Sequence, residues 1–185
     1  MGAIREHPPV LLLMAAFSRH VEALEWGRHA AEAAWGPAAL SSEPFAFHET
    51  RFYEATMGAG LVKVFFAFQR LIDPEDLPSL KHQTNAWEEQ CRAQARWPEP
   101  RPLNMDPGYL TPAKLVLATT KDRDHRIYVG RGIFAEVTLH YQRGQWQARP
   151  WTYPDYQRSD YHQFFERCRE YLRQRVRGNP GCEFR

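Results

Sequence analysis

Apolar and polar residues alternate along the chain in two different ways, and this predicts both strands and helices. Residues 10–17 form a continuous run of eight apolar side chains, the pattern of a strand buried inside a sheet. Residues 19–35 follow as a predicted helix, with Ser18 at its N-cap and Gly36-Pro37 at its end. The chain therefore opens with a strand followed by a helix.

Two further strands are predicted at residues 45–54 and 61–70, joined by a glycine-rich turn at 57–60. In the second strand, Val64 and Phe66 share one face and Lys63 lies on the other. We expect the two strands to form an antiparallel hairpin.

Asp73-Pro74 then begins a helix, since aspartate caps it and proline suits its first turn. Its apolar face is marked at intervals of three and four residues by Leu77, Leu80, Thr84, Trp87 and Cys91. Prolines within 97–102 end it, and residues 101–106 predict a short strand. The resulting order β-α-β-β-α-β is typical of a ferredoxin-like sandwich, with a four-stranded antiparallel sheet and two helices on one face.

The rest of the chain predicts more antiparallel sheet and a last helix. A type II turn is expected at 106–109, strands at 114–120, 127–129, 133–141 and 145–149, and an amphipathic helix at 159–176. The fold class is α+β. We expect a single domain over residues 1–178, with the ferredoxin-like half at 9–106, hairpins plus the C-terminal helix at 107–178, and a tail at 179–185.

Composition narrows the class of protein. The 185 residues carry a net charge of only +2, which argues against a dedicated nucleic-acid coat but leaves room for a local basic patch. No apolar run is long enough to span a bilayer, and the N-terminus lacks a secretory signal. The three cysteines have no C-x-x-C spacing, so we expect Cys91 and Cys168 to be core thiols in a cytoplasmic protein.

The strongly marked catalytic motifs are missing. Gly58-x-Gly60-x-x-Lys63 is too short for a phosphate-binding P-loop and is better explained as a hairpin turn. There is no H-E-x-x-H, no G-x-S-x-G and no glycine-rich loop after the first strand. These absences exclude several enzyme classes without excluding an enzyme.

Polar residues are concentrated between positions 101 and 126. Thr120 and Lys121 end a predicted strand, where backbone N–H groups, a hydroxyl and an ammonium can converge on an anion. Arg126 can hold phosphate through two parallel hydrogen bonds. Further candidates for ligand contacts are Arg101, Lys114 and Tyr128. The alternative is a solvated loop in which Lys121, Asp122, Arg123 and Asp124 satisfy one another.

Glu136 is an acidic residue in the middle of an apolar strand, so it is either exposed or paired. It is a candidate general base, or a magnesium ligand together with Asp106. The structural alternative, which we favour, is an ion pair with Arg126 or Lys121 across the hairpin. His125 is the candidate acid or base near neutral pH.

Five ordered motifs, spread over most of the chain, resemble one family. They are His48-x-Thr50-x-x-Tyr53-Glu54-x-x-Met57-Gly58, Arg101-x-x-Asn104-x-Asp106-Pro107-Gly108-Tyr109-Leu110, Thr119-Thr120-Lys121-Asp122-x-x-His125-Arg126-Ile127-Tyr128, Gly132-Ile133-x-Ala135-Glu136-Val137-Thr138-Leu139 and Trp151-Thr152-Tyr153-Pro154-Asp155-Tyr156. The chain resembles the bacterial family catalogued as domain of unknown function 4416. That resemblance implies a polar signature comprising Asp106, Lys121, His125, Arg126 and Glu136. Some members carry a GTP-binding label, but this chain lacks both the P-loop and an N-K-x-D motif.

We therefore expect a protein that binds a phosphate-bearing small ligand, for example a nucleotide, with magnesium as the metal to test. Phosphoryl transfer or phosphoester hydrolysis is the first reaction class to test, because it needs mainly positioning and charge. The alternative is a non-catalytic module that binds a protein or RNA through the sheet face and the arginine-bearing last helix. Convergence of the polar signature on one cavity would favour the small ligand.

Overall fold

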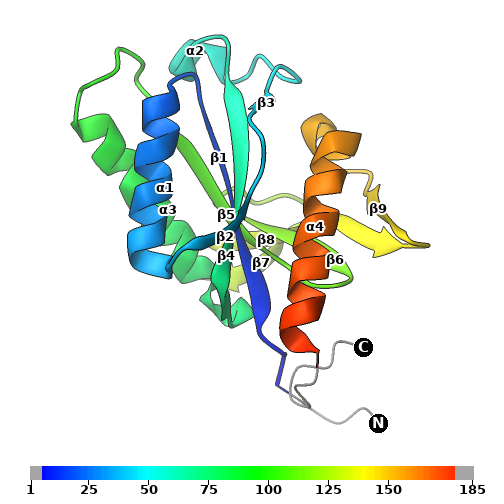
Figure 1. Ribbon diagram of the computed structural model, residues 1–185. Helices are drawn as coiled ribbons and strands as arrows, with labels where there is room; N and C mark the ends of the chain where they lie inside the picture. Colours follow the sequence, from blue (N-terminus) through cyan, green and yellow to red (C-terminus); the bar gives the residue numbers. More distant parts are fainter. Residues whose placement is uncertain (1–5, 178–185) are drawn as a thin grey trace.

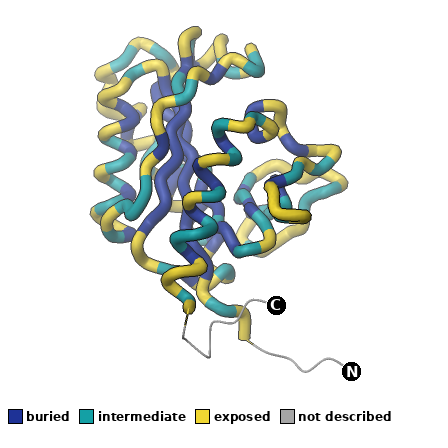
Figure 2. Tube along the Cα trace, turned by 45° about the vertical axis from the view of Figure 1, so that its right-hand side comes forward, coloured by how far each residue is buried: buried dark blue, intermediate teal, exposed yellow. Residues whose placement is uncertain are grey.

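The apolar run near the N-terminus forms the central strand of a large antiparallel sheet (Figure 1). A computed structural model describes residues 6–177. In it, all nine residues of β1 (Val10–Ser18) are buried, between β4 (Val62–Ile72) on one side and β5 (Asn104–Leu110) on the other. Figure 2 shows these buried central strands as the dark core of the molecule.

The sheet has nine strands, and every pairing is antiparallel. Its main path runs through β2 (Ala38–Ser41), β4, β1, β5, β6 (Lys114–Thr119), β8 (Ile133–Gln142) and β7 (Ile127–Gly130), while β3 (Phe45–Ala46) pairs with β4 and β9 (Gln145–Ala148) pairs with β8. The later strands thus continue the first sheet through the pairing of β5 with β6.

Helices cover both faces of this sheet. On one side of β1, Leu12 and Met14 pack in one core with α1 (Val21–Trp35) and α3 (Leu77–Ala93). On the other side, Leu11 and Leu13 pack against α4 (Ser159–Val176). The run is apolar throughout, rather than alternating, because neither face of β1 meets water.

Three short helical segments complete the described chain: α2 (Glu54–Met57) and the 3₁₀ turns η1 (Pro74–Asp76) and η2 (Pro154–Gln157). No described helix is long and apolar enough to cross a membrane. The expected tail at 179–185 lies outside the described residues.

Several predictions from the sequence pattern are confirmed. The last helix has the expected bounds, with Phe165 and Cys168 on its buried stripe. The face of α3 marked by Leu80 and Cys91 is buried, and Lys63 lies on the face of β4 opposite to Val64. Cys91 and Cys168 are buried free thiols.

The type II turn predicted at 106–109 is wrong, since these residues lie within β5. Pro107 pairs with Met14 of β1, and hydrogen-bonded pairing with β6 starts only at Gly108. A Cβ on Gly108 would lie 2.3 Å from the carbonyl oxygen of Val116. This glycine permits a close approach of two strands rather than a turn.

The strand predicted at 45–54 is also wrong beyond Ala46, where β3 ends. The apolar side chains that follow build a separate small core, in which Phe47 packs with Phe17, Met57 and Leu61. The alternation of apolar residues in this segment reflects that core and not a long strand.

Ser18 is not the N-cap of α1. It ends β1, where its hydroxyl donates to the carbonyl of Pro102 at 2.6 Å and accepts from the backbone N–H of His20. His20 occupies the N-cap position and makes no side-chain capping bond.

Candidate functional site

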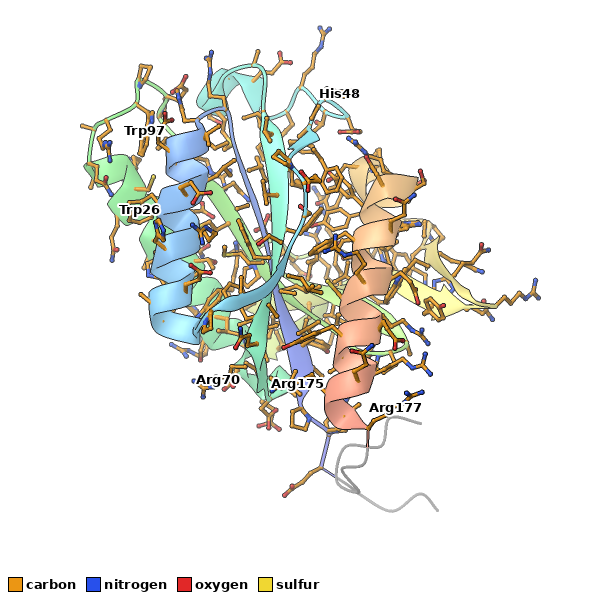
Figure 3. All side chains as sticks on the ribbon, in the orientation of Figure 1. Trp26, His48, Arg70, Trp97, Arg175 and Arg177 are labelled. Atoms are coloured by element: carbon orange, nitrogen blue, oxygen red, sulfur yellow. The ribbon has the colours of Figure 1, made fainter. Side chains whose placement is uncertain are left out.

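A cavity of about 630 Å³ lies where β5 and β6 separate. The two strands pair only between Gly108–Leu110 and Leu115–Leu117. Beyond that point β5 stays with β1 and β6 stays with β8, so the sheet forks. Both arms of the fork line the cavity, together with the loop after β6, the segment after β3 and η2. Figure 3 draws the side chains of the described residues and labels His48, in the segment after β3.

Six of the nine site residues expected from sequence line this cavity: Arg101, Asp106, Thr120, Lys121, Arg126 and Glu136. They come from both arms of the fork and from the loop after β6. The fork thus brings together side chains that are up to 35 positions apart in the chain.

The other three expected residues lie elsewhere. Lys114 begins β6 at the end away from the cavity, and Tyr128 is an exposed residue of β7 whose hydroxyl accepts from the N–H of Gly132. The ring of His125 stacks on Trp151 and does not line the cavity, although its Nε2 lies 3.4 Å from Glu136 Oε2.

The first charged group of the cavity is the buried pair of Lys63 and Asp155. Their side chains are each 5% exposed, and Nζ donates to Oδ2 at 2.5 Å. The ammonium also lies 4.1 Å from the centre of the Phe47 ring. Its distances from the ring centres of Phe17 and Tyr156 are 5.1 and 5.0 Å. An ion pair supplemented by cation–π contacts makes this lysine a fully satisfied cation.

The second pair joins Lys81 of α3 to Asp106 of β5. Lys81 Nζ donates to Asp106 Oδ1 at 2.7 Å and to the carbonyl of Met105 at 3.1 Å, and the Asn104 amide donates to Oδ2 at 2.8 Å. Burial by itself would raise the pKa of Asp106, but Lys81 and Asn104 hold that pKa below its ordinary value. Asp106 is therefore an ionised carboxylate at neutral pH.

The third pair is Arg126 with Glu136, whose side chains are 4% and 3% exposed. Arg126 Nε donates to Glu136 Oε2 at 2.7 Å, which confirms the structural pairing favoured for this strand carboxylate. The same guanidinium donates to the backbone carbonyl of Lys121 and to the hydroxyl of Tyr153, both at 2.9 Å. Arg126 thus ties the loop after β6 to β8 and to the segment before η2.

Both residues expected to bind magnesium, Asp106 and Glu136, belong to these ion pairs. Asp106 and Glu136 are each neutralised by a cationic side chain. Among residues 6–177, no group of three or more histidine, cysteine or acidic side chains is arranged to hold a metal ion.

The loop after β6 differs from the three pairs. Lys121 and Arg123 are exposed, line the cavity and form no ion pair within the described part of the chain. The Lys121 ammonium lies 5.1 Å from the centre of the Phe52 ring, and its backbone N–H donates to the hydroxyl of Thr119. The alternative of mutual pairing within residues 121–124 is not found in the described loop, where Asp124 pairs with His125 instead.

The lining includes polar residues that the sequence pattern did not indicate as site residues, among them Lys63, Lys81 and Asn85. Lys63 interrupts the apolar run 62–68 of β4, and an interruption of this kind is the signal that indicated Glu136. Lys81 and Asn85 follow the buried Leu77 at intervals of four residues, beside the helix face that Leu80 and Thr84 mark. Their convergence with β5 is a tertiary feature.

Tyr53 contributes a phenol to the cavity wall. Burial, followed by the nearby charge of Asp106, raises the pKa of Tyr53 to about 12, so the hydroxyl keeps its proton at neutral pH.

The comparisons with known proteins agree with the motifs. A family model described as domain of unknown function 4416 matches residues 8–171, which is most of the chain and includes every wall of the cavity. Searches of curated proteins and of solved structures found no match. The chain belongs to the family of domain of unknown function 4416.

Proposed function

We propose that the cavity at the fork binds a small phosphate-bearing ligand, with Lys121 and Arg123 as the cations that meet the phosphate. The carrying observation is that these two cations line the cavity without an ion pair among the described residues. Lys63, Lys81 and Arg126 are already neutralised by carboxylates of the protein. A ligand anion would satisfy the loop cations that the protein leaves unmatched.

The overall charge of the lining supports an anionic ligand. Six cationic and four acidic side chains line the cavity, so its potential is positive. A volume of about 630 Å³ lies within the range of cavities that hold small molecules, and it would accommodate a nucleotide.

Arg126 has a different role in this proposal from the one expected from sequence. Three of its five N–H groups are used by Glu136, Lys121 and Tyr153. We assign it to positioning, because it holds the backbone of the loop that presents Lys121.

Binding is better supported than catalysis. His125 does not line the cavity, Asp106 is held ionised by Lys81, and Glu136 is paired with Arg126. None of the three stands in the cavity as an unengaged base, so phosphoryl transfer and hydrolysis are not part of the proposal.

Two further proposals concern the fold of the first half of the chain and the location of the protein in the cell. We propose that residues 9–106 form a ferredoxin-like half, a view supported by the strand order β2-β4-β1-β5 and by α1 and α3 on one face. We also propose a cytoplasmic location, which the free thiols of Cys91 and Cys168 support.

A thermal-shift screen tests the proposed ligand class. The panel holds pyrophosphate, sugar phosphates, nucleotides and a short RNA, each with and without magnesium. A ligand at 100 times its Kd stabilises the folded state by about 2.7 kcal/mol, which for a chain of this size raises Tm by roughly 5 to 10 °C.

Two lysine variants make the result specific. Lys121→Ala should abolish the shift, whereas Lys114→Ala, at the other end of β6 and outside the cavity, should retain it. If no phosphate compound shifts Tm, the proposal is wrong and the alternative of a protein- or RNA-binding module is favoured. Helices cover both faces of the central strand, so such a module would use a part of the sheet other than β1, or the outer face of α4.

A further inference from the structure

We infer that the ligand carries a sugar as well as a phosphate, and that Asp106 and Asn85 bind its hydroxyl groups. This inference rests on the proposed function for the position of the phosphate. It concerns the lining that comes from β5 and α3, which are separate elements from the loop that carries Lys121.

Asp106 offers a fixed, ionised acceptor to the cavity. Its side chain is 34% exposed, although Lys81, its partner, is only 6% exposed. A carboxylate has about four acceptor sites, and the donors from Lys81 and Asn104 occupy one on each oxygen. Because these two donors fix its orientation, Asp106 presents its remaining lone pairs in one direction at no further entropic cost.

Asn85 supplies a second polar group on the same wall. It lies four residues after Lys81 on α3, which places both side chains on one face of the helix. Its amide is half-buried and lines the cavity, and no hydrogen bond to it is found within residues 6–177. A primary amide has both donors and an acceptor, so Asn85 can complement a hydroxyl in either role.

The charges on this wall explain why a hydroxyl fits better than a second phosphate. The carboxylate of Asp106 accepts hydrogen bonds but cannot donate them, so it repels a phosphate oxygen and needs a donor. An anion alone, held by Lys121 and Arg123, would leave the remaining acceptor sites of Asp106 and the amide of Asn85 unused. A sugar phosphate satisfies both walls, with its anion at the loop and its hydroxyls at Asp106 and Asn85.

The aromatic lining is consistent with this class of ligand. Tyr53 and Phe52 contribute ring surface to the cavity, and burial, followed by the charge of Asp106, raises the pKa of the Tyr53 phenol to about 12. The apolar C–H face of a sugar ring can pack on such rings while its hydroxyls reach the polar wall.

Calorimetric titration of the full chain tests the inference with three probes: ribose 5-phosphate, inorganic phosphate and free ribose. The informative variant is Asn85→Ala, since it removes no hydrogen bond of the described protein and should fold normally. Gln90→Ala, on the exposed part of the same helix and outside the cavity, is the matched control. Asp106→Asn is a second variant that keeps the shape of the side chain.

We expect ribose 5-phosphate to bind wild type more tightly than inorganic phosphate does. Asn85→Ala should weaken ribose 5-phosphate about tenfold, the effect of one hydrogen bond, and leave inorganic phosphate within about twofold. Asp106→Asn should also weaken ribose 5-phosphate selectively, and Gln90→Ala should change neither affinity.

Equal loss of both phosphate probes in Asn85→Ala, or no loss of either, would overturn the inference. Binding of inorganic phosphate to wild type as tightly as ribose 5-phosphate would also overturn it. The Lys121→Ala variant distinguishes a failure of this inference from a failure of the proposed function. If Asn85→Ala weakens ribose 5-phosphate while Lys121→Ala does not, the sugar contact stands and the phosphate assignment is wrong. If ribose 5-phosphate does not bind, the inference is wrong, and if no phosphate compound of the thermal-shift panel binds either, both are wrong.

Discussion

Two regions of the cavity use charged residues in opposite ways. Along its inner surface, Lys63, Asp155, Arg126 and Glu136 are almost fully buried, and each has a partner of opposite charge. In the loop after β6, Lys121 is exposed and has no ion pair among the described residues. The difference separates charges that maintain the structure from charges that are available to a ligand.

The physical reason lies in the cost of burial. An ion removed from water loses several kcal/mol of hydration, so a buried cation must be matched inside the protein. An exposed lysine keeps its hydration and needs no partner. Cationic residue types in a cavity are therefore a poor guide to a binding site until their partners are known.

Breaking a buried pair should give the largest effect. Lys63→Met leaves Asp155 as an uncompensated buried carboxylate, so we expect it to lower the free energy of unfolding by about 4 kcal/mol. Urea unfolding monitored by circular dichroism measures the change. The double variant Lys63→Met/Asp155→Leu removes both charges and should recover most of the loss. A single variant as stable as wild type would show that the pair is not a structural requirement.

The next largest loss of stability should come from Gly108, where the pairing of β5 with β6 begins. Gly108→Ala places a Cβ 2.3 Å from the Val116 carbonyl oxygen, so the strands must move apart, at a cost of about 2 to 3 kcal/mol. Gly27→Ala in α1 is the control, because its new Cβ meets only the movable ends of Leu103 and Met105, at 3.0 and 3.2 Å. If both substitutions cost the same in urea unfolding, the close approach of β5 and β6 is not what requires the glycine.

The contribution of the Lys81–Asp106 pair to the free energy of unfolding should depend on pH. Because the folded-state pKa of Asp106 is lowered, its stabilisation is complete above the unfolded-state value of about 3.9 and is lost as pH falls through the folded-state value. We expect Asp106→Asn to cost roughly 1 to 2 kcal/mol at pH 7, and the gap from wild type to close as pH falls below about 4. Urea unfolding between pH 7 and pH 3 follows this gap. A gap that is independent of pH would contradict an ionic role for Asp106.

The smallest effect on stability should come from the exposed loop. Lys121→Ala removes no ion pair among the described residues, so its free energy of unfolding should stay within about 0.5 kcal/mol of wild type. The same urea series checks this value. A loss above 1 kcal/mol would place Lys121 with the structural charges and not with the ligand-binding ones.

The sequence predicted the parts of the fold whose environment is set locally. The continuous apolar run of β1 and the stripe of α4 both reflect the number of faces that are buried, so pattern alone identified them. Pro107-Gly108 carried the composition of a turn, yet it lies in a strand because two backbones approach closely there. The short β2 has no distinctive pattern, and its pairing with β4 arises from tertiary structure.

The candidate site was predictable to a similar extent. Lys121 was identified by its place at the end of a predicted strand, and Glu136 because it interrupts an apolar strand; both line the cavity. Asn85 does not stand out in its helix, and its place at the cavity depends on how α3 packs against β5. Local sequence reports the type of a residue, whereas its partners, and hence its availability, come from segments far away in the chain.

The most direct test measures stability and anion binding together in one pair of variants. Pyrophosphate is titrated calorimetrically into wild type, Lys121→Ala/Arg123→Ala and Lys114→Ala, and each protein is also unfolded in urea. We predict that all three have the same stability to within about 1 kcal/mol and that only the double loop variant loses pyrophosphate binding, by at least tenfold. Unchanged pyrophosphate affinity in the folded double variant would contradict the account, because the unpaired loop cations would then have no part in binding the anion.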